Sequence, residues 1–315
     1  TEGNKTGVLT ELLYRMSSVD HEIAYMPSHW SKRFSAEELF PYYFKFCEDI
    51  TKDARNSYKH ELNISYGASD RTKYDIYGTD LPKDAPILVF IHGGYWMEFS
   101  KDLSGFVVPN FVSKGIKVIV AGYDLCPNVT LTEIVQQAKT LAEKILVMAK
   151  SLGSKGVWIC GHSAGAHLAA SLIHDQNWLD VITRHKCRDL FKGLVLIGGV
   201  YALEPLLRVS VNESLKLTPN EISTLSFAPL QEGDDGNKKL ESVQKVKVIV
   251  TVGECDSPIF IEESRRYARR LTKMVDNVEF ILMRNNTDHF DIVENLVKGD
   301  FLLSRVMVDN IWNGF

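Results

Sequence analysis

The sequence predicts an α/β protein built on a doubly wound, mostly parallel sheet, and three observations carry that prediction. Short apolar strands alternate with amphipathic helical segments from residue 87 onward, as they do in parallel sheets covered by helices on both faces. An apolar strand runs into a G-x-S-x-G turn and then into a helix at residues 157–168. With 315 residues, of which 45% are hydrophobic and 24% charged, the chain can bury a large core. We therefore expect a single domain over residues 1–315 with about eight strands.

Residues 1–58 are predicted to form a helical segment ahead of the sheet. Residues 10–17 are amphipathic, and Ser35 opens a capping box with Glu38 before an apolar helical pattern. Pro41 falls in or near the first turn of that helix, where proline is tolerated. Residues 25–30 lie between the two helices and are unusually bulky for a loop. We expect this N-terminal segment to form part of a lid.

The strands and helices of the predicted sheet follow in order. Residues 60–66 and 73–77 alternate in polarity and predict an antiparallel hairpin at one sheet edge. Buried strands are expected at residues 87–91, 117–121, 157–160, 193–197, 247–252 and 278–282. Helices are expected at residues 105–114, 131–152, 164–174, 257–273 and 301–312. Helices therefore cover both faces of the sheet.

The segment 200–245 interrupts this alternation. It holds short helical pieces, three prolines and a polar loop at residues 232–239. A connection between two strands needs far fewer residues. We expect the insertion to complete a helical lid together with the N-terminal segment.

Ser163 is the leading candidate for a nucleophile. In a strand–turn–helix motif of this kind the serine occupies a strained turn, so the positions two before and two after it must be very small. Gly161 and Gly165 meet this demand. Motifs with three fixed letters also occur by chance in loops without chemistry. The apolar strand before the turn and the helical pattern after it favour the catalytic interpretation.

A serine nucleophile needs a general base and an acid that orients the base. In this motif the acid and then the histidine follow the serine, each in a loop after a strand. Asp256 follows the strand at 247–252, and His289 follows the strand at 278–282. We predict that His289 takes the serine proton and that Asp256 holds the required imidazole tautomer.

Other acids and histidines are alternatives for these roles. Glu254 and Asp288 are the alternative acids, and we interpret both as solvated loop residues. His162 and His167 flank the serine, but their side chains are expected to point elsewhere and to be structural. Five further histidines lie outside the strand-end loops: His21, His29, His60, His174 and His185.

Donors for a tetrahedral oxyanion are expected from the backbone N–H after the serine and from the loop after the third strand. Residues 91–96, Ile-His-Gly-Gly-Tyr-Trp, supply that loop. Its glycines allow the backbone to approach a substrate closely. The loop could be only a turn, yet its place after the third strand agrees with the rest of the constellation.

Four stretches together resemble the arylformamidase, or kynurenine formamidase, family of the α/β-hydrolase fold. They are HGGYW at 92–96, GHSAGAHL at 161–168, ECDSP at 254–258 and DHFDIVENL at 288–296. The resemblance implies hydrolysis of N-formyl-L-kynurenine to L-kynurenine and formate in tryptophan catabolism. It implies a triad of Ser163, Asp256 and His289, with oxyanion donors drawn from Gly93, Gly94, Tyr95 and Ala164.

Two departures separate the chain from a neighbouring family. Hormone-sensitive-lipase-like esterases usually have a third glycine where this chain has Tyr95, and an acid where it has His162. These departures favour the formamidase interpretation. The alternatives are a general short-acyl carboxylesterase and a non-catalytic binding protein with the hydrolase fold. The presence of all three triad residues disfavours the second alternative.

Four aromatic residues are candidates for a substrate slot, with packing in the core or lid as the competing interpretation. They are Trp30, Tyr95, Trp96 and Tyr201.

Charge and composition exclude several classes of partner. The net charge is −4 and basic residues do not cluster, so nucleic acid is not expected as a partner. Neither a secretory signal nor a membrane-spanning run is indicated. Five scattered cysteines are typical of free thiols in a reducing cytoplasm, and no spacing predicts a metal or another cofactor. The expected partner is a small-molecule substrate, and the sequence leaves the oligomeric state open.

Overall fold

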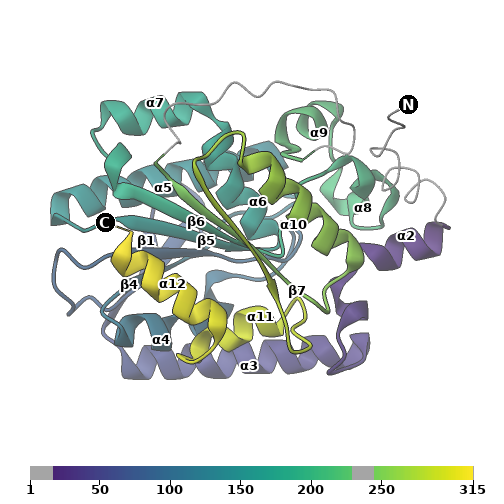
Figure 1. Ribbon diagram of the computed structural model, residues 1–315, viewed down its shortest axis with the longest axis horizontal. Helices are drawn as coiled ribbons and strands as arrows, with labels where there is room; N and C mark the ends of the chain where they lie inside the picture. Colours follow the sequence, from purple (N-terminus) through teal and green to yellow (C-terminus); the bar gives the residue numbers. More distant parts are fainter. Residues whose placement is uncertain (1–16, 229–244, 315) are drawn as a thin grey trace.

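The structure, a computed structural model, describes residues 17–228 and 245–314 and places a sheet between two layers of helices (Figure 1). The sheet has eight strands in the order β1-β2-β4-β3-β5-β6-β7-β8. The strands are β1 His60–Ser65, β2 Lys73–Tyr77, β3 Ile87–Ile91, β4 Lys117–Ala121, β5 Val157–His162, β6 Phe191–Ile197, β7 Lys247–Gly253 and β8 Asn277–Met283. The β1–β2 and β2–β4 pairs are antiparallel and the other pairs are parallel. The predicted doubly wound sheet with an edge hairpin is confirmed.

The two faces of the sheet bury separate apolar clusters, because successive side chains of a strand point to opposite faces. In β4, Val118 and Val120 pack on one face and Ile119 packs on the other. The face of Ile119 is covered by α5 Leu131–Leu152, α6 Ala164–Ser171, α7 Gln176–Arg184 and α10 Pro258–Leu271. The opposite face is covered by α3 Ala36–Ser57, α4 Val108–Ser113, α11 Asp291–Glu294 and α12 Leu302–Asn313.

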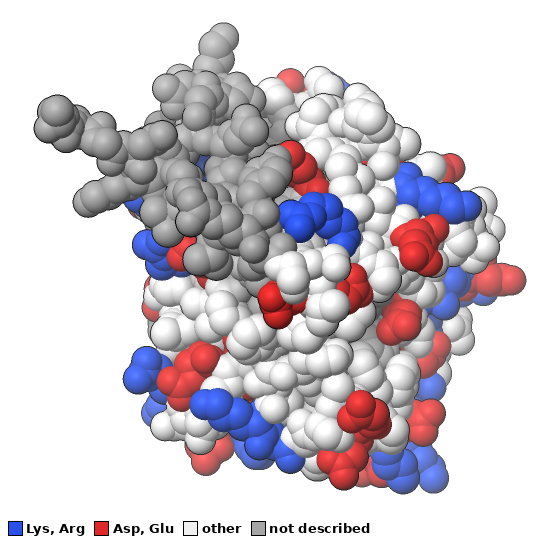
Figure 2. Space-filling model, turned by 90° about the vertical axis from the view of Figure 1, so that its right-hand side faces the viewer, with Lys and Arg blue, Asp and Glu red and all other residues white. Residues whose placement is uncertain are grey.

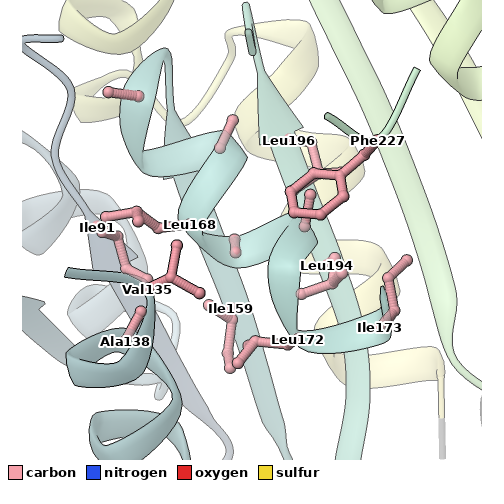
Figure 3. Close-up of a cluster of buried hydrophobic side chains, with 14 of the residues drawn as sticks. Ile91, Val135, Ala138, Ile159, Leu168, Leu172, Ile173, Leu194, Leu196 and Phe227 are labelled. Atoms are coloured by element: carbon pink, nitrogen blue, oxygen red, sulfur yellow. The ribbon is translucent and has the colours of Figure 1, made fainter. Parts of the chain in front are cut away.

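Apolar side chains fix α6 on the sheet directly behind the G-x-S-x-G turn (Figure 3). Leu168 and Leu172 belong to the same buried cluster as Ile159 of β5 and Leu194 of β6, and all four are fully or almost fully buried. Burying a leucine or isoleucine side chain contributes on the order of 1.5–3 kcal/mol. This packing fixes α6 against the sheet and therefore helps to keep the G-x-S-x-G turn that precedes it in place.

The N-terminal segment and the insertion lie beside each other (Figure 1). The segment contains α2 Ser18–Ala24 and the 3₁₀ helix η1 Pro27–Trp30 ahead of α3, and the insertion contains η6 Glu204–Arg208, α8 Asn212–Leu215 and α9 Pro219–Leu225. His21 Nε2 lies 3.0 Å from the Pro205 carbonyl oxygen, and the Ser210 N–H donates to Glu22 Oε2 over 2.8 Å. Figure 2 shows this side of the molecule, where the acidic and basic side chains of the described residues are interspersed.

Several predicted boundaries need correction. The expected helix at 105–114 begins as a 3₁₀ turn, and α4 proper starts at Val108 with Pro109 in its first turn. The expected helix at 164–174 ends as a 3₁₀ turn, and α7, capped by Asp175, was not predicted at all. The amphipathic residues 10–16 and the polar loop 232–239 lie outside the described residues.

A buried carboxylate joins α10 to both segments beside the sheet. Glu263 is 2% exposed, and its Oε2 accepts the N–H groups of Tyr201 over 2.8 Å and Ala202 over 3.1 Å. The Tyr25 hydroxyl donates to Glu263 Oε1 over 3.3 Å. Burial raises the pKa of Glu263 from 4.5 to about 7, although these donors act to lower it. The folded protein therefore keeps this carboxyl protonated in mildly acidic solution and loses the proton near neutral pH.

Substitution of Glu263 by glutamine should remove a pH dependence of stability. Because the pKa is raised in the folded state, the unfolded chain releases this proton first, and wild-type stability should fall as pH rises from about 5 to 7. The shift corresponds to roughly 3 kcal/mol. Urea unfolding at intervals from pH 5 to pH 8 should show this slope in wild type relative to Glu263→Gln. Glu262→Gln, on the same helix, is the control, and equal slopes for wild type and Glu263→Gln would contradict the prediction.

Candidate active site

Ser163 occupies a sharp turn between β5 and α6. Its backbone angles, φ 54° and ψ −119°, lie in a region that residues other than glycine rarely adopt. A Cβ at Gly161 would lie 2.1 Å from the Gly165 carbonyl oxygen, and one at Gly165 would lie 2.1 Å from that of Ile91. Only glycine fits at either position, as the motif predicts. The Ser163 N–H donates to the Ile197 carbonyl over 2.8 Å and ties the strained turn to β6.

His289 and Asp256 form a buried pair in the loops that follow β8 and β7. The imidazole Nδ1–H donates to Asp256 Oδ2 over 2.6 Å, and each residue is 3% exposed. The other carboxylate oxygen, Oδ1, accepts the Ser257 N–H over 2.7 Å. The two loops meet because Gly253 has no side chain: a Cβ there would lie 2.3 Å from the Thr287 carbonyl oxygen.

Ser163 and His289 line the same cavity, which measures about 200 Å³. Its walls are largely apolar. They consist of Met26, Pro27, Ser28, Phe40, Gly94, Tyr95, Met97, Glu98, Phe99, His162, Val211 and Phe290. Both the N-terminal segment and the insertion contribute to these walls. The cavity therefore combines a serine hydroxyl and an imidazole with a pocket suited to a mostly apolar small molecule.

The loop after β3 presents backbone N–H groups beside the serine. A Cβ at Gly93 would lie 3.0 Å from the Ser163 Cβ, so this backbone passes very close to Ser163. Gly94 and Tyr95 have positive φ angles of 98° and 47°, and within the described residues their N–H groups have no acceptor. Ala164 is the first residue of α6, so its N–H has no partner within the helix. Gly94, Tyr95 and Ala164 therefore stay candidate donors for an oxyanion.

Tyr95 is held in this unusual conformation by its own side chain. Its hydroxyl donates to the Tyr25 carbonyl over 2.6 Å, and the N–H groups of Met97 and Glu98 both donate to the Gly94 carbonyl over 2.9 Å. The tyrosine thus stands in a left-handed position that glycine would adopt more readily. This contact also connects the loop to the N-terminal segment.

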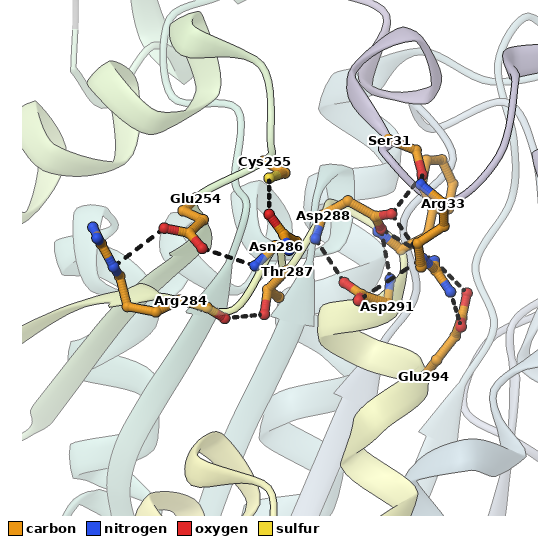
Figure 4. Close-up of polar contacts among 11 residues, drawn as sticks. Ser31, Arg33, Glu254, Cys255, Arg284, Asn286, Thr287, Asp288, Asp291 and Glu294 are labelled. Atoms are coloured by element: carbon orange, nitrogen blue, oxygen red, sulfur yellow. Dashed lines mark hydrogen bonds and ion pairs between the residues drawn. The ribbon is translucent and has the colours of Figure 1, made fainter.

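The two alternative acids, Glu254 and Asp288, do not contact His289 Nδ1. Asp288 is buried, although both were predicted to be solvated. Glu254 is partly exposed, and it accepts the Asn286 N–H over 2.8 Å and pairs with Arg284 (Figure 4). Asp288 is 0% exposed and pairs with Arg33. The interpretation of Asp288 as a solvated loop acid is wrong, because an arginine distant in sequence compensates its charge.

The histidines beside the serine are buried. His162 Nε2 lies 2.8 Å from the His289 carbonyl oxygen, so it braces the loop of the proposed base. Burial, followed by the proximity of His289, holds the pKa of His162 well below its ordinary value. His167 lies against Leu225 of the insertion, and burial lowers its pKa to about 4. Both rings are therefore neutral at physiological pH, in agreement with structural roles.

Two of the four aromatic candidates lie in the core. Tyr201 and Trp96 are both 0% exposed and do not line the cavity of Ser163. Tyr201 stacks on Tyr267 with 4.0 Å between ring centroids, and Trp96 packs edge-on against His167 at 5.0 Å. Their assignment to the substrate slot is corrected to a packing role.

The other two aromatic candidates lie nearer the surface. Trp30 lines a neighbouring groove of about 330 Å³ beside Asp256, rather than the cavity of the serine. Its indole N–H donates to the Ile23 carbonyl over 3.0 Å. Tyr95 does line the serine cavity, and its contact with substrate stays a prediction.

Most of the cavity wall was not predicted residue by residue. The bulk of residues 25–30 indicated a covering segment, but nothing in the local pattern singled out Met26, Pro27 or Ser28. Met97, Glu98 and Phe99 follow the oxyanion loop directly, and that position is the only signal that could have found them. In the described part of the chain, no three acidic, histidine or cysteine side chains are placed to hold a metal ion. None of the helices described there could cross a membrane.

Comparison with known proteins agrees with this geometry. Residues 88–291 match the model of a family with the alpha/beta hydrolase fold. A kynurenine formamidase from Salmo salar is 33% identical over 93% of this chain and 96% of its own length, and one from Danio rerio is 32% identical over 94% and 97%. The solved structure of a putative thioesterase from Silicibacter has a TM-score of 0.70 and 28% identity, covering 90% of this chain and 97% of its own. The chain therefore belongs to the kynurenine formamidase family of the α/β-hydrolase fold.

Proposed function

We propose that this protein is a serine hydrolase that cleaves N-formyl-L-kynurenine to L-kynurenine and formate, a step of tryptophan catabolism. The observation that carries the proposal is the cavity lined by both Ser163 and His289, with His289 bonded to Asp256 over 2.6 Å. Membership of the kynurenine formamidase family supports the substrate. Incubation of the purified protein with N-formyl-L-kynurenine, with release of formate and kynurenine as the readout, tests it directly.

The residues of the cavity have distinct roles in the proposed reaction. His289 accepts the Ser163 proton while the serine oxygen attacks the formyl carbon, and Asp256 stabilises the imidazolium. The N–H groups of Gly94, Tyr95 and Ala164, with Gly93 close by, receive the negative oxygen of the tetrahedral intermediate. His289 then gives the proton to the aniline nitrogen as the C–N bond breaks, which leaves formyl-serine. A water molecule, activated by His289, attacks this ester and releases formate.

A general short-acyl carboxylesterase is the second candidate function, because the cavity wall is largely apolar and would also accept a simple ester. Parallel turnover of N-formyl-L-kynurenine and a short acyl ester distinguishes the two functions. A non-catalytic binding protein would not react covalently with a fluorophosphonate. Labelling at Ser163 therefore distinguishes this third candidate from the formamidase and the esterase.

Small acyl groups should be the best substrates. Ser163 shares its cavity with Tyr95 and Phe99, and the backbone at Gly93 lies close to it, so we expect the small formyl group to meet the least steric hindrance. We expect kcat/KM to fall from formyl to acetyl to butyryl anilides. Each added methylene should cost roughly 1–3 kcal/mol in a rigid pocket. Assays of the three anilides with one common leaving group give this order, and a preference for butyryl would instead favour the general esterase.

We further propose that the N-terminal segment 1–58 and the insertion 200–245 form a lid on a single domain. Support comes from the cavity wall, to which Pro27, Ser28 and Val211 contribute from these two regions. The cytoplasm is the proposed compartment, since all five cysteines are buried free thiols. The proposed partner is the small-molecule substrate alone, without nucleic acid, membrane or cofactor.

A further inference from the structure

A compact ion cluster joins the N-terminal segment to the loop that carries His289 (Figure 4). Arg33 Nε donates to Asp288 Oδ2 over 2.9 Å, and Arg33 Nη2 donates to Oδ1 over 3.2 Å. The same guanidinium donates to both carboxylate oxygens of Glu294, over 2.8 and 3.1 Å. Ser31 adds a hydroxyl bond of 2.7 Å to Asp288 Oδ2. One arginine thus pairs with carboxylates on both sides of His289, Asp288 before it and Glu294 at the end of α11, and its Nε also lies 3.8 Å from Asp291 Oδ2.

Asp288 shapes the backbone on both sides of His289. Its Oδ1 accepts the N–H groups of Phe290 over 2.9 Å and Asp291 over 2.8 Å, and its own N–H donates to Asp291 Oδ1. These bonds enclose His289 in a tight turn at the start of α11. A displacement of Asp288 would therefore move the imidazole relative to Asp256 and Ser163.

This arrangement depends on the charge of Arg33. Asp288 is fully buried, and Asp291 and Glu294 add like charges nearby. Burial would raise the pKa of Asp288, but hydrogen bonds from Arg33, from the Asp291 N–H and from Ser31 lower it overall. Without the guanidinium, the buried carboxylate of Asp288 would lose its ion-pair partner and stand beside two other acids, which costs several kcal/mol unless the loop rearranges or takes up a proton.

The segment that supplies Arg33 also covers the substrate cavity. Pro27 and Ser28 line that cavity, and Ser31 and Arg33 follow within one short 3₁₀ turn and loop. The covering segment and the base are therefore mechanically connected through few residues. A catalytic group held to within a fraction of an ångström is sensitive to such supports, since a misplacement of about 1 Å can lower the rate roughly 100-fold.

We propose that Arg33 is a positioning residue, which holds the His289 loop in its reactive geometry from the N-terminal segment through Asp288. This inference rests on the proposed role of His289 as the base. Arg33 touches neither substrate nor the reacting atoms, so its effect should appear in kcat and in the reactivity of Ser163, rather than in substrate affinity.

The test compares Arg33→Gln and Arg33→Lys with a control, Arg55→Gln. Arg55 also lies in the N-terminal segment and pairs with a fully buried acid, Asp75 of β2, over 3.2 Å, and Asp75 keeps a second cation because Lys101 Nζ lies 2.8 Å from its Oδ1. We expect kcat of Arg33→Gln to fall roughly 10- to 100-fold with KM changed less than about threefold. Arg33→Lys should recover only part of kcat, because an ammonium cannot reproduce the bidentate contacts. Arg55→Gln should keep kcat even where its melting temperature falls.

The rate of fluorophosphonate labelling is the second readout, because it needs only Ser163 and its base. It should fall in parallel with kcat in the Arg33 variants, and it remains informative if N-formyl-L-kynurenine is not the substrate. Should Arg33→Gln fail to fold, Ser31→Ala removes a weaker contact to the same carboxylate and should lower the labelling rate measurably. Retention of wild-type labelling in Arg33→Gln, or equal losses in Arg55→Gln, would overturn the proposal.

Discussion

Replacement of Ser163 by alanine is expected to abolish covalent labelling by a fluorophosphonate and to lower turnover by several orders of magnitude. The serine is the only protein group in the proposed mechanism that bonds to the acyl carbon. What remains should be the contribution of binding and of the oxyanion donors, roughly 10³- to 10⁴-fold over the reaction in water, by analogy with other serine triads. Turnover of N-formyl-L-kynurenine and active-site labelling by mass spectrometry measure the two effects separately.

Ser171→Ala provides a control from the same helix. Ser171 is buried like Ser163 and donates its hydroxyl hydrogen to the Leu168 carbonyl over 2.7 Å, but it does not line the cavity. That variant should label and turn over like wild type. Near-full activity of Ser163→Ala would contradict the assignment of Ser163 as the nucleophile. Loss of activity in both variants would instead indicate a damaged helix.

The sheet could be predicted because its central strands are buried on both faces. Such strands are short uninterrupted apolar runs, as at β3 and at residues 193–197 of β6, and they differ clearly from the amphipathic helices between them. The serine and its partners follow from the same pattern, since the carboxyl ends of parallel strands meet at one edge. Ser163, Asp256 and His289 could therefore be named without knowledge of any contact.

The surroundings of the site could not be predicted, because they depend on contacts between distant parts of the chain. From its position in the sequence, Asp288 is expected to be a solvated loop acid. Only the fold brings Arg33, 255 positions away in the sequence, into contact with it. Tyr201 follows a strand end, where exposure is common. It is buried because Glu263 binds its N–H and Tyr267 stacks on its ring. The local sequence around Asp288 or Tyr201 does not indicate these partners.

The substitution Asp256→Asn is expected to lower kcat by roughly 10⁴-fold while leaving the fold intact, a magnitude taken from the corresponding change in other triads. The expected cause lies in the hydrogen bonds of the carboxylate. Ser257 N–H donates to Oδ1 over 2.7 Å, and this contact should hold the amide oxygen of an asparagine in the same place. The amide NH₂ would then face His289 Nδ1, where a carboxylate oxygen stood.

An NH₂ group in that position donates a hydrogen bond, so Nδ1 must accept and the ring proton must move to Nε2. Nε2 would then be a donor toward Ser163 and could not take its proton. Glu254→Gln is the matched control, because Glu254 follows the same strand but binds Arg284 and the Asn286 N–H instead of the imidazole. Its kcat should stay within about twofold of wild type, since solvent-facing ion pairs contribute little. If Glu254→Gln were the damaging change and Asp256→Asn nearly neutral, Asp256 would not be the acid that orients His289.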